Sequence, residues 1–237
     1  MFKIILWDID NTLLSFDAAE KVALAKGFEE FQFGEFNEEM LKNYKEINHK
    51  LWRKLERGEI TKPEVLVGRF EEFFPIYGIS PEYAQKFDLR YQELLGDTIC
   101  FHDDAYEIVK DLKGKFLQCA ASNGTKVAQV RKLKNSGLDQ LLDFIFISED
   151  VGAEKPSIEF FDKAFAEIRE WLKAHNQAAL NLSEVIMVGD SLTSDILGAN
   201  NAGIKSCWYN PKGLKNDKSV QVDYEIKDLH EIYEILK

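Results

Sequence analysis

The chain has 237 residues, of which 45% are hydrophobic and 30% are charged, and these shares are ordinary for a soluble globular protein. Its formal net charge of -11 argues against a nucleic-acid polymer or an anionic membrane as a partner, although a small anionic substrate can still bind at a local cationic site. The three cysteines have no CxxC spacing and no apolar run reaches the length of a membrane span. We therefore expect a cytoplasmic protein without a zinc site.

The chain begins with a short apolar run, residues 2–7, that predicts a strand buried on both faces. The segment at residues 15–95 has no convincing strand and is typical of successive amphipathic helices separated by glycine and proline. We therefore expect an all-helical domain at residues 15–95, inserted into a core formed by residues 1–14 and 96–237. The four predicted helices are residues 17–33, 38–57, 62–74 and 81–95.

After the insert, short apolar runs alternate with helical patterns. Strand alternating with helix indicates right-handed βαβ units, and such units build a parallel sheet. The fold class we expect is therefore α/β, with a doubly wound, Rossmann-like parallel sheet. The further predicted strands are residues 116–121, 144–147, 185–188 and 205–209, and the clearest helices are residues 126–135 and 157–173.

Small or charged residues follow four of the five predicted strands. In an open parallel sheet the carboxyl ends of the strands meet at one edge, and ligands bind there. We therefore expect these side chains, which are far apart in the sequence, to form one site. They are Asp8 and Asp10 after the first strand, Ser122, Asn123 and Gly124 after the second, Lys155 beyond the third, and Asp190 with Asp195 after the fourth.

Four carboxylates at one edge cannot all stay ionised without a counter-charge. A hard cation with oxygen ligands supplies it, and Mg²⁺ is the usual ion where a phosphate group completes the coordination shell. Lys155 would add a second positive charge, while Ser122 and the backbone amides of Asn123 and Gly124 would donate hydrogen bonds to phosphate oxygens. A carboxylate that attacks phosphorus forms an aspartyl-phosphate, so these residues favour phosphoryl transfer over metal storage.

Four motifs resemble those of the haloacid dehalogenase superfamily, in the same order and at plausible spacing. They are Asp8-Ile9-Asp10-Asn11-Thr12, Ser122-Asn123, Lys155-Pro156, and Gly189-Asp190 through Asp195, and they span most of the chain. The helical insert lies between the first and second motifs, so it resembles the type I cap of this superfamily. The interval between the second and third motifs is too short for a second large cap.

The resemblance implies a role for each matching residue. Asp8 would be the nucleophile, and Asp10 would be the acid that protonates the leaving group and then the base that activates water. Asp190 would bind Mg²⁺ together with the Asp8 carboxylate and the Asp10 backbone carbonyl, and Asp195 would hold the metal shell in place. The groups that would bind the phosphoryl oxygens belong to Ser122, Asn123 and Lys155, and Lys155 would also be catalytic.

The second aspartate of the first motif narrows the assignment. Haloacid dehalogenases proper lack it and phosphonoacetaldehyde hydrolases carry a small residue there, so Asp10 favours a phosphatase. Residues 13–16, 189–196 and 207–211 further resemble the YjjG-type pyrimidine 5′-nucleotidases. That resemblance implies a Mg²⁺-dependent phosphatase, monomer or homodimer, whose substrate is a small phosphorylated metabolite, a nucleoside 5′-monophosphate. The alternatives are a sugar-phosphate phosphatase, a phosphomutase and a catalytically idle domain that binds a metabolite.

Overall fold

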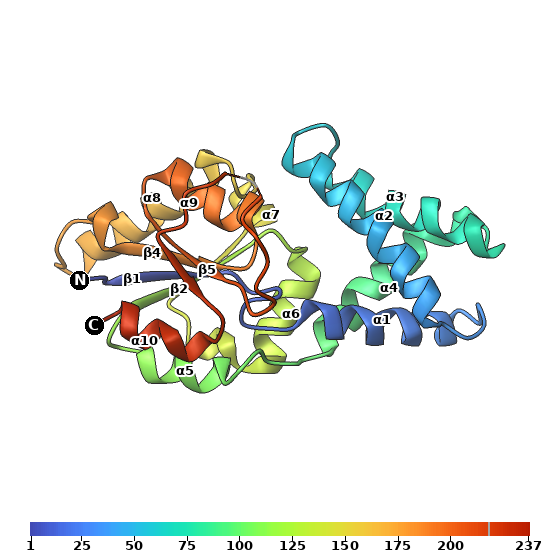
Figure 1. Ribbon diagram of the computed structural model, residues 1–237, viewed down its shortest axis with the longest axis horizontal. Helices are drawn as coiled ribbons and strands as arrows, with labels where there is room; N and C mark the ends of the chain where they lie inside the picture. Colours follow the sequence, from blue (N-terminus) through green and yellow to red (C-terminus); the bar gives the residue numbers. More distant parts are fainter. Residues whose placement is uncertain (218) are drawn as a thin grey trace. The chain divides into compact units, whose positions relative to one another are not determined.

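The computed structural model describes residues 1–217 and 219–237 and divides the chain into two compact units (Figure 1). The core unit consists of Met1–Ser15 and Ile99–Lys237, and the helical unit is the contiguous segment Phe16–Thr98. Among the described residues, no helix is both long enough and apolar enough to span a membrane.

Within the described residues, the core unit contains a six-stranded sheet in which all neighbouring strands are parallel. The strand order is β3-β2-β1-β4-β5-β6, which is the order of a doubly wound α/β fold. The predicted fold class is confirmed, and each predicted strand is present to within two residues. The strands are β1 (Ile4–Trp7), β2 (Leu117–Ser122), β3 (Phe144–Ile147), β4 (Val185–Gly189), β5 (Lys205–Tyr209) and β6 (Tyr224–Ile226).

Among the described strands, β6 is the one that the sequence does not predict. It lies at the edge of the sheet beside β5, and it has no apolar run. Tyr224 and Glu225 are exposed and only Ile226 is buried, because an edge strand has less of its surface to cover. A three-residue strand of this composition cannot be distinguished from a loop by its pattern.

Helices cover both faces of the sheet (Figure 1). Successive residues of a strand point to opposite faces, so Ile5 and Trp7 of β1 pack in one hydrophobic layer and Ile4 and Leu6 in the other. The β1 strand is therefore buried on both sides. One layer contains α5 (Ala105–Leu112), α6 (Lys126–Ser136) and α10 (Ile232–Ile235), and the other contains α8 (Ile158–Ala174) and α9 (Leu197–Ala202).

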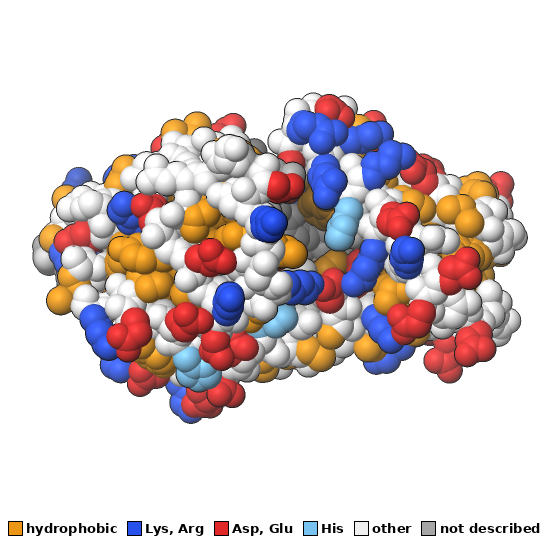
Figure 2. Space-filling view, viewed as in Figure 1, with side chains coloured by type: hydrophobic (Ala, Val, Ile, Leu, Met, Phe, Trp, Pro, Cys, Tyr) orange, Lys and Arg blue, Asp and Glu red, His pale blue; other side chains and the backbone are white. Residues whose placement is uncertain are grey.

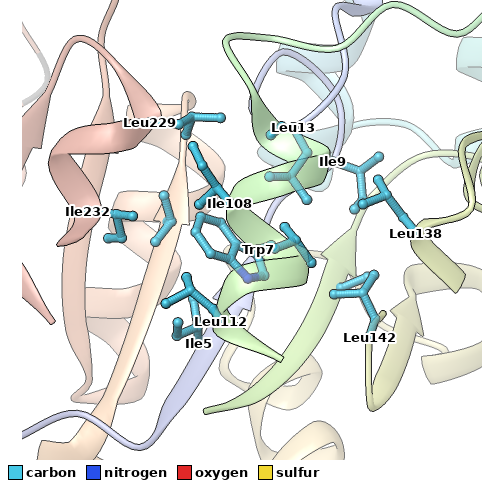
Figure 3. Packing of buried hydrophobic residues seen from close by; sticks show 14 of the residues in the cluster. Ile5, Trp7, Ile9, Leu13, Ile108, Leu112, Leu138, Leu142, Leu229 and Ile232 are labelled. Atoms are coloured by element: carbon cyan, nitrogen blue, oxygen red, sulfur yellow. The ribbon is translucent and has the colours of Figure 1, made fainter. Parts of the chain in front are cut away.

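Trp7 is the largest side chain at the centre of the first layer (Figure 3). Its indole Nε1 donates a hydrogen bond to Gln118 Oε1 at 3.1 Å, and Gln118 Nε2 donates to the Val109 carbonyl oxygen at 2.8 Å. The buried polar atoms of both side chains are thus satisfied, and β1 is linked through β2 to α5. This packing fixes the end of β1, after which Asp8 follows directly.

The helical unit has the four main helices that the sequence predicts, within the part of the chain that the structure describes. The predicted fourth helix begins later than expected, because Pro81–Tyr83 form a 3₁₀ turn before it. The Asn37 side chain accepts a hydrogen bond from the Met40 amide at 3.0 Å and so caps the second helix. The helices are α1 (Phe16–Glu30), α2 (Glu38–Glu56), α3 (Lys62–Phe73) and α4 (Ala84–Asp97).

Packed aromatic side chains form a large part of the core of the helical unit. The Phe70 and Phe87 rings meet edge to face with their centroids 4.8 Å apart, and the Phe28 and Phe87 centroids are 5.9 Å apart. A Cβ atom at Gly27 would lie 2.7 Å from the Phe87 ring, so glycine lets α1 approach α4 closely. These buried aromatic residues are therefore structural.

Helix α2 carries acidic residues at its start and basic residues at its end. Glu38 and Glu39 lie in its first turn and Arg53 and Lys54 in its last turn. These charges stabilise the helix, because each pair interacts favourably with the helix dipole at its end. Figure 2 shows Lys and Arg side chains gathered over the part of the helical unit where α2 ends.

A buried polar cluster lies among these aromatic rings. The Arg69 guanidinium donates to Asp88 Oδ1 at 2.6 Å and to Asn48 Oδ1 at 3.3 Å, and only 2% of its side chain is exposed. Glu20 is buried beside it, with its Oε1 accepting from Asn48 Nδ2 at 3.5 Å and its Oε2 lying 3.6 Å from Lys45 Nζ. Burial raises the pKa of Glu20 from 4.5 to about 7 despite the nearby Lys45.

Replacing Glu20 with Gln is expected to stabilise the protein at neutral pH but not at acidic pH. Between pH 4.5 and about 7 the unfolded chain ionises Glu20 while the folded protein keeps it protonated, so stability falls as pH rises through this window. The size of the pKa difference corresponds to at most about 3 kcal/mol in favour of Glu20→Gln above pH 7. Urea unfolding of the wild-type protein and Glu20→Gln at about pH 5 and about pH 8 measures this difference in the free energy of unfolding. A difference that does not grow with pH would contradict the raised pKa of Glu20.

Candidate active site

The candidate site lies where the order of the sheet reverses. Strand β1 pairs with β2 on one side and with β4 on the other, so the connections leave in opposite directions from this point. Asp8 follows β1 directly, Asp190 follows β4, and Ser122 is the last residue of β2. The structure thus places the ends of three strands side by side, as the sequence predicts from their polar termini.

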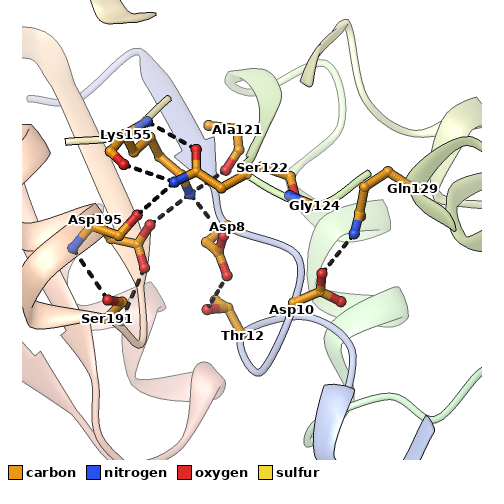
Figure 4. Close-up of polar contacts among 12 residues, drawn as sticks. Asp8, Asp10, Thr12, Ala121, Ser122, Gly124, Gln129, Lys155, Ser191 and Asp195 are labelled. Carbon is orange, nitrogen blue, oxygen red and sulfur yellow. Dashed lines mark hydrogen bonds and ion pairs between the residues drawn. The ribbon is translucent and has the colours of Figure 1, made fainter. Parts of the chain in front are cut away.

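Asp8 is held by two side chains at the end of β1 (Figure 4). Lys155 Nζ donates to Asp8 Oδ1 at 2.8 Å, and Thr12 Oγ1 donates to Asp8 Oδ2 at 3.0 Å. Burial and the neighbouring Asp195 carboxylate nevertheless raise the pKa of Asp8 to about 7, against the opposing effect of Lys155. The single ammonium group therefore does not balance the negative charge around Asp8.

Lys155 connects Asp8 to Asp195. Its side chain is 1% exposed, and its Nζ lies 2.8 Å from Asp8 Oδ1 and 2.6 Å from Asp195 Oδ1. It also donates to the backbone carbonyl of Ala121 in β2. Burial alone would lower the pKa of Lys155, but the two carboxylates raise it above its ordinary range, so the ammonium stays charged.

Asp195 is fixed by contacts on both of its oxygens. Lys155 binds Oδ1, and the Ser191 amide donates to Oδ2 at 3.0 Å. Asp195 lies in the π-helical turn Leu192–Ile196, which directs its side chain back over the end of β4. A Cβ atom at Gly189 would collide with the Asp195 carboxylate, so only glycine at this position permits the arrangement.

Asp190 is the carboxylate at this edge that has no hydrogen-bond partner among the described residues. Burial, followed by the charges of Asp8 and Asp195, raises its pKa well above the ordinary value. Its backbone carbonyl accepts a hydrogen bond from the Trp208 indole at 2.8 Å, which holds the strand end in place. The side chain is therefore positioned but not neutralised by the protein.

Asp8, Asp190 and Asp195 can fit one metal ion. Each offers a carboxylate oxygen, and these oxygens lie within 4.8 Å of one another. Carboxylate oxygens are the ligands that Mg²⁺ prefers, and a dication would offset the burial and the mutual repulsion that raise the pKa values of Asp8 and Asp190. The donor set and its excess negative charge thus fit Mg²⁺.

Ser122 at the end of β2 and Asn123 just after it differ in what their side chains contact. Ser122 Oγ accepts a hydrogen bond from the Gly124 amide at 3.1 Å, within the turn that leads to α6. The Asn123 side chain turns away from that turn: its Nδ2 donates to the Lys155 carbonyl at 2.7 Å, and its Oδ1 accepts from the Lys155 amide at 2.9 Å. Asn123 therefore holds the Lys155 backbone, and only its own backbone remains as a candidate phosphate ligand.

Asp10 lies apart from the other carboxylates and faces α6 (Figure 4). Gln129 Nε2 donates to Asp10 Oδ2 at 2.6 Å, and Lys132 forms an ion pair with Asp10 Oδ1. The sequence does not single out Gln129 or Lys132. The sequence offers only a weak signal for them. Gln129 and Lys132 are three residues apart on a helix whose one face must pack against the sheet.

Comparison with known proteins agrees with this geometry. Residues 5–209 match the family described as haloacid dehalogenase-like hydrolase. The HAD-hydrolase YfnB of Bacillus subtilis is 34% identical over 235 residues, which cover 99% of this chain and 95% of the relative. The pyrimidine 5′-nucleotidase PynA of Streptococcus pneumoniae is 33% identical over 239 residues, and the pyrimidine 5′-nucleotidase YjjG of Escherichia coli is 28% identical over 232. These matches cover 99% and 98% of this chain and 95% and 96% of the relatives.

The fold is also similar to a solved structure along its whole length. The crystal structure of YfnB bound to magnesium superposes with a TM-score of 0.89 at 33% identity, and the match covers 100% of this chain and 99% of that one. The chain belongs to the haloacid dehalogenase-like hydrolases. The family and the enzyme class that the motifs imply are therefore confirmed.

Proposed function

We propose that the protein is a Mg²⁺-dependent phosphatase that works through an aspartyl-phosphate on Asp8. The observation that carries the proposal is the arrangement at the end of β1, where a buried carboxylate is oriented by Thr12 and Lys155 beside two further carboxylates. Thr12 donates to one carboxylate oxygen of Asp8 and Lys155 donates to the other. The Asp8 carboxylate is therefore held in one orientation, from which it would attack phosphorus. An ionised carboxylate needs no base to activate it as a nucleophile, so its orientation is what the protein must supply.

The proposed division of labour follows from the contacts. Asp8, Asp190 and the backbone carbonyl of Asp10 would hold the Mg²⁺, with Asp195 beside them. When bound, the ion would neutralise charge and orient the phosphoryl group. Lys155 and Ser122 would bind the phosphoryl oxygens.

Asp10 would carry out both proton transfers of the reaction. It would give one to the leaving-group oxygen as the bond from phosphorus to that oxygen breaks. It would then take one from the water that attacks the phosphorus of the Asp8 phosphate. The two transfers return Asp10 to its starting state.

The proposed substrate is a nucleoside 5′-monophosphate with a pyrimidine base. The support is the pair of relatives named pyrimidine 5′-nucleotidase, which align with nearly the whole chain. A small anion is compatible with the net charge of -11, because the proposed Mg²⁺ together with the buried Lys155 would supply the local positive charge.

Phosphate release from a panel of substrates tests both parts of the proposal. The panel contains pyrimidine and purine nucleoside monophosphates, in ribo and deoxy forms, and several sugar phosphates. With Mg²⁺ we expect the pyrimidine nucleotides to have the highest kcat/KM, and we expect EDTA to lower the rate at least about a hundredfold until Mg²⁺ is restored. Turnover that persists in EDTA would contradict the metal assignment.

The same panel separates the rival functions. Sugar phosphates with the highest kcat/KM would indicate a sugar-phosphate phosphatase, and isomerised product without phosphate release would indicate a mutase. No reaction with any compound would indicate an idle domain. Binding of Mg²⁺ is measured separately, because an ion that binds the folded protein raises its Tm. The Tm increase should disappear in Asp190→Asn.

A further inference from the structure

The contacts of Asp10 with α6 are more elaborate than a turn after a strand requires. Both oxygens of one carboxylate are bound by two side chains of one helix, Gln129 and Lys132. These two residues are three positions apart, so they lie on the same face of α6. Figure 4 shows the Asp10 carboxylate directed toward Gln129, whereas the Asp8 carboxylate is directed toward Lys155 and Thr12.

The burial of Lys132 argues against a purely stabilising role. Only 2% of its side chain is exposed, compared with 24% for Asp10. A buried ion pair adds little to stability, because removing both charges from water offsets their attraction, and an apolar side chain of similar size would pack about as well. The pair is better explained by its effect on the orientation of Asp10.

Gln129 supports the same conclusion. Its side chain is buried, and its Oε1 has no hydrogen-bond partner among the described residues, whereas its Nε2 binds Asp10. The orientation of the Gln129 side-chain amide is therefore set by the hydrogen bond from its Nε2 to Asp10. A Cβ atom at Gly124 would collide with this amide, so the turn after β2 leaves room for Gln129 to reach Asp10.

We propose that Lys132 and Gln129 are positioning residues for Asp10, which hold its carboxylate in the orientation it needs for proton transfer. The inference rests on the proposed function, in which Asp10 protonates the leaving group. In that step the bond between phosphorus and the leaving oxygen breaks, the oxygen takes the proton of Asp10, and Asp8 becomes bonded to phosphorus. Lys132 and Gln129 gain and lose no proton, so they act only through the position of Asp10.

Two substrates with different leaving groups test the proposal. Lys132→Met removes the charge and keeps most of the side chain. With the best nucleotide or sugar phosphate from the panel, whose alcohol leaving group needs a proton, we expect kcat/KM to fall roughly 10- to 100-fold, part of what a general acid contributes. With p-nitrophenyl phosphate, whose leaving group departs without protonation, the fall should be less than about threefold, and Lys132→Arg should restore most of the loss.

Controls separate positioning from folding. Lys134→Met removes an exposed lysine of the same helix and should leave kcat/KM unchanged with both substrates. In an Asp10→Asn background, Lys132→Met should cause no further selective loss, because the group it positions is already absent. Equal losses with both substrates would overturn the proposal. An inactive wild-type protein would instead overturn the proposed function itself, so the two failures are distinguishable.

Discussion

Asp8→Asn is expected to lower turnover by at least about 10⁴-fold while the protein stays folded. The substitution removes the nucleophile, and with it the covalent route, but keeps the shape of the side chain. The fold should survive, because burial and Asp195 make the ionised Asp8 unfavourable, as its raised pKa of about 7 indicates. Initial rates with the best substrate and a thermal unfolding curve measure the two effects.

The covalent intermediate can also be observed directly. Acid quenching during turnover, followed by borohydride reduction, converts an aspartyl-phosphate into homoserine, which mass spectrometry assigns to one position. We expect the label at Asp8 in the wild-type protein and none in Asp8→Asn. Asp195→Asn, which keeps the nucleophile, is the matched control and should still give the label at Asp8. Near-normal rates in Asp8→Asn, or a label elsewhere, would contradict the assignment.

The second large effect concerns stability. Arg69→Met is expected to lower the free energy of unfolding by about 3–5 kcal/mol, because it leaves the buried Asp88 without its cationic partner. The guanidinium also lies 5.1 Å from the Phe70 ring centroid and 4.9 Å from that of Tyr91, so two cation–π contacts disappear as well. Urea unfolding of the full chain, followed by circular dichroism, measures the loss.

Two variants test the reason for that loss. Arg53→Met removes an exposed arginine of α2 and should change stability by less than about 0.5 kcal/mol. Arg69→Met combined with Asp88→Leu removes both charges and should recover much of the stability. A double variant as unstable as Arg69→Met alone would show that packing, and not the unpaired carboxylate, is responsible.

The sequence predicts the fold well because its signals are strong where the sheet is buried. Runs such as residues 185–188 are continuous in apolar residues, and polar residues follow them at once. The rules for parallel sheets then bring Asp8, Ser122 and Asp190 to one edge without any knowledge of distances. The catalytic roles of these residues remain predictions until the variants are measured.

The contacts that complete the site could not be predicted, since they depend on burial. Lys126, Lys132 and Lys134 lie in one helix and are equivalent by composition, yet only Lys132 is buried. The Asn123 side chain likewise could have faced a phosphate group. Its contacts with the Lys155 backbone depend on the path of a loop that follows another strand.

The pairing of β1 has a consequence for how the enzyme folds. Trp7 is opposite Ala120 on one side and Val188 on the other, so the strand that precedes Asp8 has no neighbour that is close in sequence. Closing such long loops is unfavourable in entropy, and proteins rich in non-local pairings fold slowly. The helical unit is one contiguous segment and needs no such closure. During synthesis, Asp8 and Asp10 are therefore made early, but the site can be assembled only after β4 and the Asp190 and Asp195 that follow it have left the ribosome.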